Sequence, residues 1–160
     1  MIEPTVLAYA AGMIDGDGCV QVNKKKRKDL SNIYYSITAS VSQVNEDVPN
    51  WLMRNFGGTI FKYTLNKEKR QPLYRWSIHC KQASNFLQLI LPYLVQKSER
   101  SKLAIHLQEL MVPKYEFNGK NPVRMKPSYE EQTYRESIFK RMKELNKSTG
   151  RNHFKNIGVN

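Results

Sequence analysis

Residues 10–18 have the sequence AAGMIDGDG, in which a run of small and apolar residues leads directly into two closely spaced carboxylates. Pro4 predicts that a helix begins shortly before this stretch, because a proline in the first helical turn has no amide hydrogen to leave unpaired. Ala8, Ala11 and Gly12 fall at positions i, i+3 and i+4, so they predict a narrow stripe along that helix. A second helix backbone can approach such a stripe closely, and we therefore expect an interface there.

Asp15 and Asp17 stand at the predicted helix end, where the last carbonyls already carry partial negative charge and a positive group must compensate. One interpretation of the Asp-Gly-Asp-Gly segment is an ordinary turn. A calcium loop of the EF-hand kind is excluded, because its remaining ligand and glycine positions hold Cys19, Val20 and Lys26. The third interpretation is a site in which Asp17 and a backbone carbonyl hold a divalent cation such as Mg²⁺.

The composition favours a nucleic-acid partner. The chain has 160 residues, with 26 Lys and Arg against 14 Asp and Glu, giving a formal charge of +12. Such a basic protein pairs with a polyanion, nucleic acid before acidic membrane. No apolar run reaches membrane-spanning length and the start lacks a signal-like segment, so we expect a soluble intracellular protein. We expect Cys19 and Cys80 to be reduced core thiols, since their spacing fits neither a zinc site nor a disulfide framework.

Hydrophobic periodicity predicts the elements after the first helix. Apolar and polar residues alternate from Cys19 to Lys25, a cationic turn is expected over 24–29, and the clearest alternation is over 33–43, where Ile33, Tyr35 and Ile37 share one face. The remaining expected elements are a helix over 47–56, strands over 60–65 and 74–80, a helix over 85–94, a helix over 103–111, a connector over 114–127, and a last helix that begins with the capping box at Ser128.

This order predicts a single α+β domain over residues 1–148, with C-terminal helices from about residue 97 and a basic, flexible tail over 149–160. Helices should cover one face of a four-stranded antiparallel sheet. The other face then meets solvent or a ligand.

Residues 10–18 resemble the signature of the LAGLIDADG homing endonucleases, with Ala10 in place of the leading leucine and Met13 in place of the internal one. The resemblance spans about residues 5–112. It implies the family's αββαββα core, in which the sheet forms a DNA-binding saddle. Only one acidic motif is present in the chain, so the resemblance further implies a homodimer.

The resemblance also implies roles for particular residues. Asp17 and the Gly16 carbonyl would bind Mg²⁺, with two or three divalent cations in each active site of the dimer. Asp15 would hold the helix end at the dimer interface. Gln43 would position the water network, although an ordinary strand-end polar residue is the alternative, and Lys97 would lie near the scissile phosphate, although a solvated helix-end cation is the alternative. Residues 45–47 are Asn-Glu-Asp, so the basic helper that some relatives carry there is missing.

Polar side chains of the strands are the expected DNA contacts, because a β-ribbon fits the major groove. Between residues 18 and 80 there are 11 basic and 4 acidic residues, which an ordinary soluble face would mix more evenly. The candidates are Gln21, Asn23, Lys24, Lys25, Arg27, Lys28, Tyr34, Ser36, Thr38, Ser40, Arg75 and Ser77.

The sequence therefore predicts a homodimeric, magnesium-dependent, site-specific endonuclease that cuts both strands of a long, nearly palindromic DNA duplex. The resemblance implies a gene within an intron, whose homing the cut promotes. The alternative is a nucleic-acid binder of the same fold that does not cut, either an RNA-binding intron maturase or a transcriptional regulator. A basic structural protein of a ribonucleoprotein ranks last, because it needs neither the stripe nor the motif.

Overall fold

The computed structural model describes residues 2–26, 33–64 and 71–151. Its first half contains α1 (Pro4–Asp17), β1 (Gly18–Lys26), β2 (Ile33–Gln43), α2 (Asp47–Phe56), β3 (Thr59–Tyr63) and β4 (Leu73–His79). Its second half contains α3 (Cys80–Ile90), the 3₁₀ turn η1 (Leu91–Tyr93), α4 (Ser98–Leu110), β5 (Tyr115–Asn118), β6 (Asn121–Arg124) and α5 (Tyr129–Arg151). The predicted αββαββα order and α+β class are confirmed.

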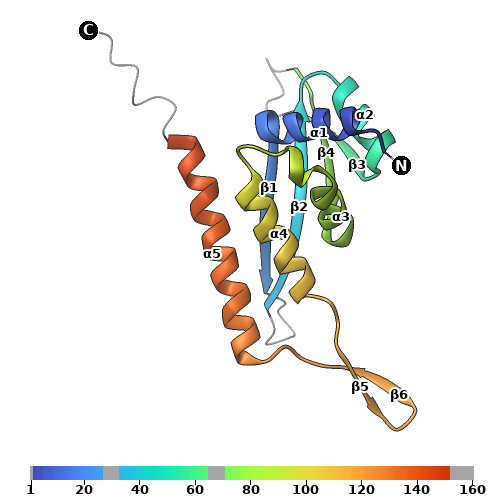
Figure 1. Ribbon diagram of the computed structural model, residues 1–160, viewed down its shortest axis with the longest axis vertical. Helices are drawn as coiled ribbons and strands as arrows, with labels where there is room; N and C mark the ends of the chain where they lie inside the picture. Colours follow the sequence, from blue (N-terminus) through green and yellow to red (C-terminus); the bar gives the residue numbers. More distant parts are fainter. Residues whose placement is uncertain (1, 27–32, 65–70, 152–160) are drawn as a thin grey trace.

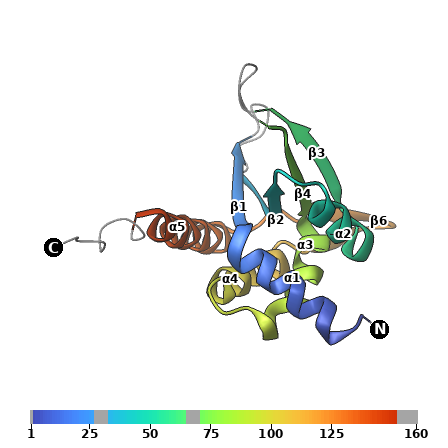
Figure 2. The same ribbon diagram turned by 90° about the horizontal axis from the view of Figure 1, so that it is seen from above.

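The four long strands form one antiparallel sheet in the order β1-β2-β4-β3. Helices α1, α3 and α4 lie on one side of this sheet, and the other side is open (Figure 2). Helix α1 lies across one end of the strands, and α5 runs beside β1 (Figure 1). The alternation of β2 explains this arrangement, because Ile37, Ala39 and Val41 are fully buried on the helix side.

The ends of several elements follow from local chemistry that the sequence predicted. Gly57 and Gly58 both adopt positive φ and end α2, as expected. Gly18 at the exit of α1 admits no side chain, because a Cβ there would lie 2.6 Å from the Cα of Ile14. The Ser128 hydroxyl accepts a hydrogen bond from the Glu131 amide at 3.1 Å, which confirms the Ser128 half of the capping box, while the Glu131 carboxylate pairs with Arg135 at 2.6 Å.

Three expectations are wrong. Cys80 is exposed and begins α3 with φ 50°, so it is not a core thiol, while Cys19 is half-buried. Residues 114–127 are not a plain connector, because β5 and β6 pair antiparallel within them. Helix α5 continues to Arg151, so residues 149–151 belong to it and not to a flexible tail, and the rest of the expected tail lies outside the described residues.

Candidate functional site

The C-terminal end of α1 and the N-terminal end of α4 cap each other. The Asp15 carboxylate accepts hydrogen bonds from the amides of Val95, Gln96 and Lys97 at 2.7, 3.2 and 2.9 Å. In return, the Lys97 ammonium donates to the carbonyls of Ile14 and Asp15 at 2.7 and 2.6 Å. The carboxylate thus satisfies amides ahead of α4, and the ammonium is the positive group that the end of α1 requires.

Lys97 is buried, with 8% of its surface exposed, so the interpretation as a solvated helix-end cation is wrong. Burial and the nearby charge of Arg100 lower the pKa of Lys97, whereas the carboxylates of Asp15 and Asp17 act in the opposite direction. A buried ammonium is costly unless it is fully hydrogen-bonded. The two short bonds to α1 carbonyls supply that compensation and fix the helix end.

Asp17 is the carboxylate that this capping leaves accessible. Its side chain is exposed at the last residue of α1, and its Oδ2 accepts a hydrogen bond from the Gln43 side-chain amide at 2.9 Å. Gln43 ends β2, which pairs with the strand that follows Asp17. Antiparallel pairing therefore brings together these two predicted site residues, although they are 26 positions apart.

The donor set at this end of α1 fits a hard divalent cation. Among the described residues, the other Asp17 oxygen has no hydrogen-bond partner, and the Gly16 carbonyl receives only a 3.5 Å contact from the Lys97 ammonium. Carboxylate and carbonyl oxygens are the ligands that Mg²⁺ prefers. Within the described part of the chain, no three His, Cys, Asp or Glu side chains gather as a metal site, so the Asp17 carboxylate and the Gly16 carbonyl are the candidate ligands at this end of α1.

The exposed stripe of α1 differs from the predicted one. Ala8 and Gly12 are exposed, but Ala11 is fully buried against the sheet, so its assignment to the interface is corrected. Gly16 takes its place, and the stripe consists of Ala8, Gly12 and Gly16 at intervals of four. Cβ atoms built on Gly12 and Gly16 would meet nothing within 4 Å. This surface is open to the close approach of another backbone.

The open side of the sheet carries most of the expected DNA contacts. Lys25 and Tyr34 are exposed, and the half-buried candidates beside them are Gln21, Asn23, Ser36 and Arg75. Thr38, Ser40 and Ser77 lie on the same side but are at most 5% exposed. Asn23 donates to the Thr38 hydroxyl at 2.9 Å, and Arg75 donates to Ser40 at 3.1 Å. These bonds fix the Asn23 and Arg75 side chains, which face outward. The hydroxyls of Thr38, Ser40 and Ser77 have little exposure to solvent.

Three candidate DNA contacts have other outcomes, and the sequence analysis missed one exposed residue of the open side. Lys24 points to the helix side, where its ammonium pairs with Glu136 of α5 at 2.7 Å, so it is not a phosphate contact on the open side. Arg27 and Lys28 lie outside the described residues. Phe61 faces the open side beside Arg75 and is 59% exposed. The weak alternation of β3 left its faces unassigned, and only its register with β4 assigns them.

Comparison with protein families matches residues 10–110 to the model of the LAGLIDADG endonuclease family. The chain belongs to this family.

Solved structures of similar fold agree. The archaeal intron-encoded homing endonuclease I-Vdi141I, in complex with DNA, is similar with TM-score 0.69 and 15% identity over 90% of this chain and 86% of that one. The homing endonuclease I-CvuI, bound to its target in the presence of Ca, gives TM-score 0.66 and 19% identity over 87% and 80%. Comparison with curated proteins found no match. Over the described residues, no helix has the length and apolar character needed to cross a bilayer.

Proposed function

We propose that the chain is a site-specific, divalent-metal-dependent DNA endonuclease that acts as a homodimer on a long, nearly palindromic duplex. The observation that carries this proposal is the accessible Asp17 carboxylate, held by Gln43, at the end of a helix whose small-residue stripe is uncovered. Family membership and the DNA complexes named above support the same activity.

A second copy would complete the site. Packing of two α1 helices through Ala8, Gly12 and Gly16 brings two Asp17 carboxylates together at the paired helix ends. At about 4 Å such carboxylates repel by roughly 4 kcal/mol at an effective dielectric constant of 20, so the pair requires cations. The paired Asp17 carboxylates and Gly16 carbonyls would hold Mg²⁺, which would supply the activation of a water and the neutralisation of charge on the phosphate and the leaving oxygen.

The chain's own groups would place the reacting atoms. Gln43, fixed against Asp17, would orient the water network. Lys97 would keep the end of α1 rigid and contribute positive charge close to the Asp17 carboxylate, on which it acts electrostatically. The open side of the sheet would hold one half-site in each copy, with Gln21, Asn23 and Arg75 facing the bases.

The test begins with selection of duplexes from a randomised library by the full chain in Ca²⁺, followed by addition of Mg²⁺ and capture of cut ends. We expect double-strand breaks in selected duplexes. Asp17→Asn should bind them with unchanged affinity but cut at least about a thousandfold more slowly, because a metal ligand is lost. The matched control, Asp47→Asn, removes an exposed carboxylate from the first turn of α2 and should cut normally.

Cutting that persists in Asp17→Asn would overturn the assigned role of Asp17. Loss of DNA binding in that variant would make Asp17 a structural residue instead. A wild-type chain that binds structured RNA and never cuts DNA would replace the proposed endonuclease with the maturase alternative.

A further inference from the structure

We propose that the β5–β6 hairpin is a second DNA-binding element, which contacts the duplex beyond the part covered by the sheet. This inference rests on the proposed function, because it requires a duplex on the open side of the sheet. It assigns a DNA contact to residues 114–126, which lie outside the family match.

The hairpin has too little internal packing to account for its own stability. Every residue of both strands is exposed, including Phe117 at 76%, Tyr115 at 55% and Val123 at 51%. An isolated two-stranded hairpin is marginally stable in water. Exposed aromatic residues on such an element indicate a surface that a partner covers.

The charges of the hairpin identify the partner as an anion. Residues 114–126 contain four basic residues and one acid, Glu116; the basic residues are Lys114, Lys120, Arg124 and Lys126. Lys114 pairs with Glu131 at 3.6 Å. For Lys120, Arg124 and Lys126, the described residues provide no ion pair. Three unneutralised cations on an extended element favour the phosphates of a nucleic acid.

One face of the hairpin combines Arg124 with the two aromatic residues. Tyr115 pairs with Arg124 and Phe117 with Pro122 across the two strands, so these side chains share a face. A two-stranded ribbon of this kind fits a groove of duplex DNA. The arginine can then contact phosphate or a base edge while the rings cover sugar and base surfaces.

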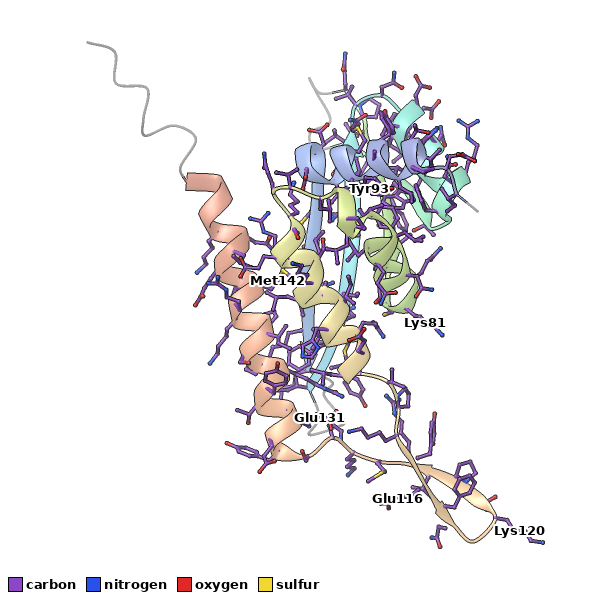
Figure 3. All side chains as sticks on the ribbon, in the orientation of Figure 1. Lys81, Tyr93, Glu116, Lys120, Glu131 and Met142 are labelled. Carbon is purple, nitrogen blue, oxygen red and sulfur yellow. The ribbon has the colours of Figure 1, made fainter. Side chains whose placement is uncertain are left out.

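The position of the hairpin matches the path of a duplex along the sheet. It projects from the end of the sheet opposite α1, with Lys120 at its tip (Figures 1 and 3). A cavity of about 430 Å³ at its base is lined by Ile33 and Tyr34 at the start of β2 and by Arg124 and Met125. The lining also includes Tyr35, Glu131 and Arg135 from the helix side, so the cavity lies where the hairpin meets the end of the sheet, and Tyr34 is its residue on the open side.

The length of the hairpin strands predicts how many base pairs the hairpin adds to each half-site. Four residues of antiparallel strand rise about 13 Å, which is roughly the length of four base pairs at 3.4 Å each. Each half-site should therefore extend by roughly four base pairs at its outer end. The contact should depend strongly on salt and weakly on sequence, because most of it is made to phosphates.

The experiment uses the full chain and duplexes that it selects. Each duplex is prepared in a long form and in a form shortened by four base pairs at both ends. We expect Lys120→Ala/Arg124→Ala to bind the long form at least about tenfold more weakly at 0.1 M salt, with a log-log salt slope smaller by about 1.8 per copy, since each lost phosphate contact contributes about 0.9. The hydroxyl-radical footprint should shorten at both ends.

Both proteins should bind and cut the shortened duplex equally well, which shows that the variant is folded. The matched control, Lys81→Ala/Lys102→Ala, removes the same charge from α3 and α4, where both lysines are exposed, and should keep the full footprint. Phe117→Ala separates the aromatic contribution from the charge.

An unchanged footprint and salt slope in the hairpin variant would overturn the inference while leaving the proposed function intact. So would a hairpin variant that alters only self-association or RNA binding. A wild-type chain that selects no duplex at all would instead refute the proposed function, and with it the basis of this inference.

Discussion

The two ends of the sheet differ in how completely their polar groups are satisfied within one chain. At the α1 end, Asp15 accepts from the amides just ahead of α4, and Lys97 donates to the last carbonyls of α1. At the opposite end, the hairpin leaves aromatic side chains and three cations to solvent. The first end is built to hold one carboxylate, Asp17, in a fixed place. The second end leaves its side chains exposed, and we propose that DNA covers them.

The two ends therefore differ in the kind of molecule that each is proposed to bind. In the proposed function, the α1 end takes another copy of the same chain, because among the described residues no three metal-binding side chains gather and the small-residue stripe is uncovered. The hairpin end needs a ligand of opposite charge. Mutations at the α1 end should therefore act on cutting and folding, whereas mutations at the hairpin end should act on the length and salt dependence of DNA binding.

Gly12→Leu should give the largest effect, because it blocks close approach of the second α1. We expect loss of the dimer in sedimentation and at least about a thousandfold loss of cutting, since a monomer lacks the second carboxylate. The monomer itself should stay folded and gain up to about 1 kcal/mol, because nothing lies within 4 Å of the added Cβ and leucine favours helix over glycine.

Gln88→Leu is the matched control for this change, because it adds the same side chain to an exposed position of α3. It should leave both sedimentation and cutting unchanged. A Gly12→Leu protein that remains a dimer would remove α1 from the interface and leave the far end of the molecule as the candidate for self-association.

Asp15→Ala should have the next largest effect, on stability. The change leaves the amides of Val95, Gln96 and Lys97 without their acceptor and costs about 2 kcal/mol. For a domain of this size, that lowers the melting temperature by about 4–8 °C in a thermal scan. Glu116→Ala in the hairpin should shift it by less than about 1 °C, because the described residues give Glu116 no ion pair. Equal shifts would contradict the contrast between the two ends.

Much of the α1 end could be predicted from its sequence, because the motif combines a helix pattern with residue types that have few other uses. The helix and the strand after it follow that prediction, whereas the hydrogen bond between Asp17 and Gln43 comes from the structure alone. The side of α1 that faces the core could not be predicted, because small residues lie on several sides of the helix and make its hydrophobic periodicity ambiguous. Ile14 identifies the buried side of the helix, because Ala10 and Ala11 lie four and three positions before Ile14 and are buried with it.

The remaining differences between the expected and the observed structure have two causes. One is tertiary contacts, and the other is a turn signal whose flanking residues show little strand alternation. Burial of Lys97 could not be predicted, because the carbonyls that accept its bonds come from a helix over 80 positions away. The hairpin did have a signal, the dipeptide Asn118-Gly119, and Gly119 adopts φ 67° at its turn. Its flanks do not alternate strongly, so the segment was expected to be a connector.

The smallest effect should come from Glu136 of α5, which joins that helix to the strands between the two ends. Glu136 accepts hydrogen bonds from Tyr35 and from Lys24. Partial burial alone would raise the pKa of Glu136, but these bonds and the charge of Lys24 hold the pKa below its ordinary 4.5. A lowered carboxyl pKa stabilises the fold at neutral pH, and that contribution is lost as the pH falls below 4.5 through the folded-state value.

We therefore expect Glu136→Gln to cost about 1 kcal/mol at neutral pH in urea unfolding, since both partners are about one-third exposed and solvent screens the pair. The difference from wild type should shrink steadily as the solution is acidified. Glu144→Gln, which removes an exposed partner of Arg141, should leave the unfolding midpoint unchanged at every pH, because solvent screens this pair. A Glu136→Gln penalty that persists in acid would mean that shape and packing at this position, and not its charge, fasten α5 to the strands.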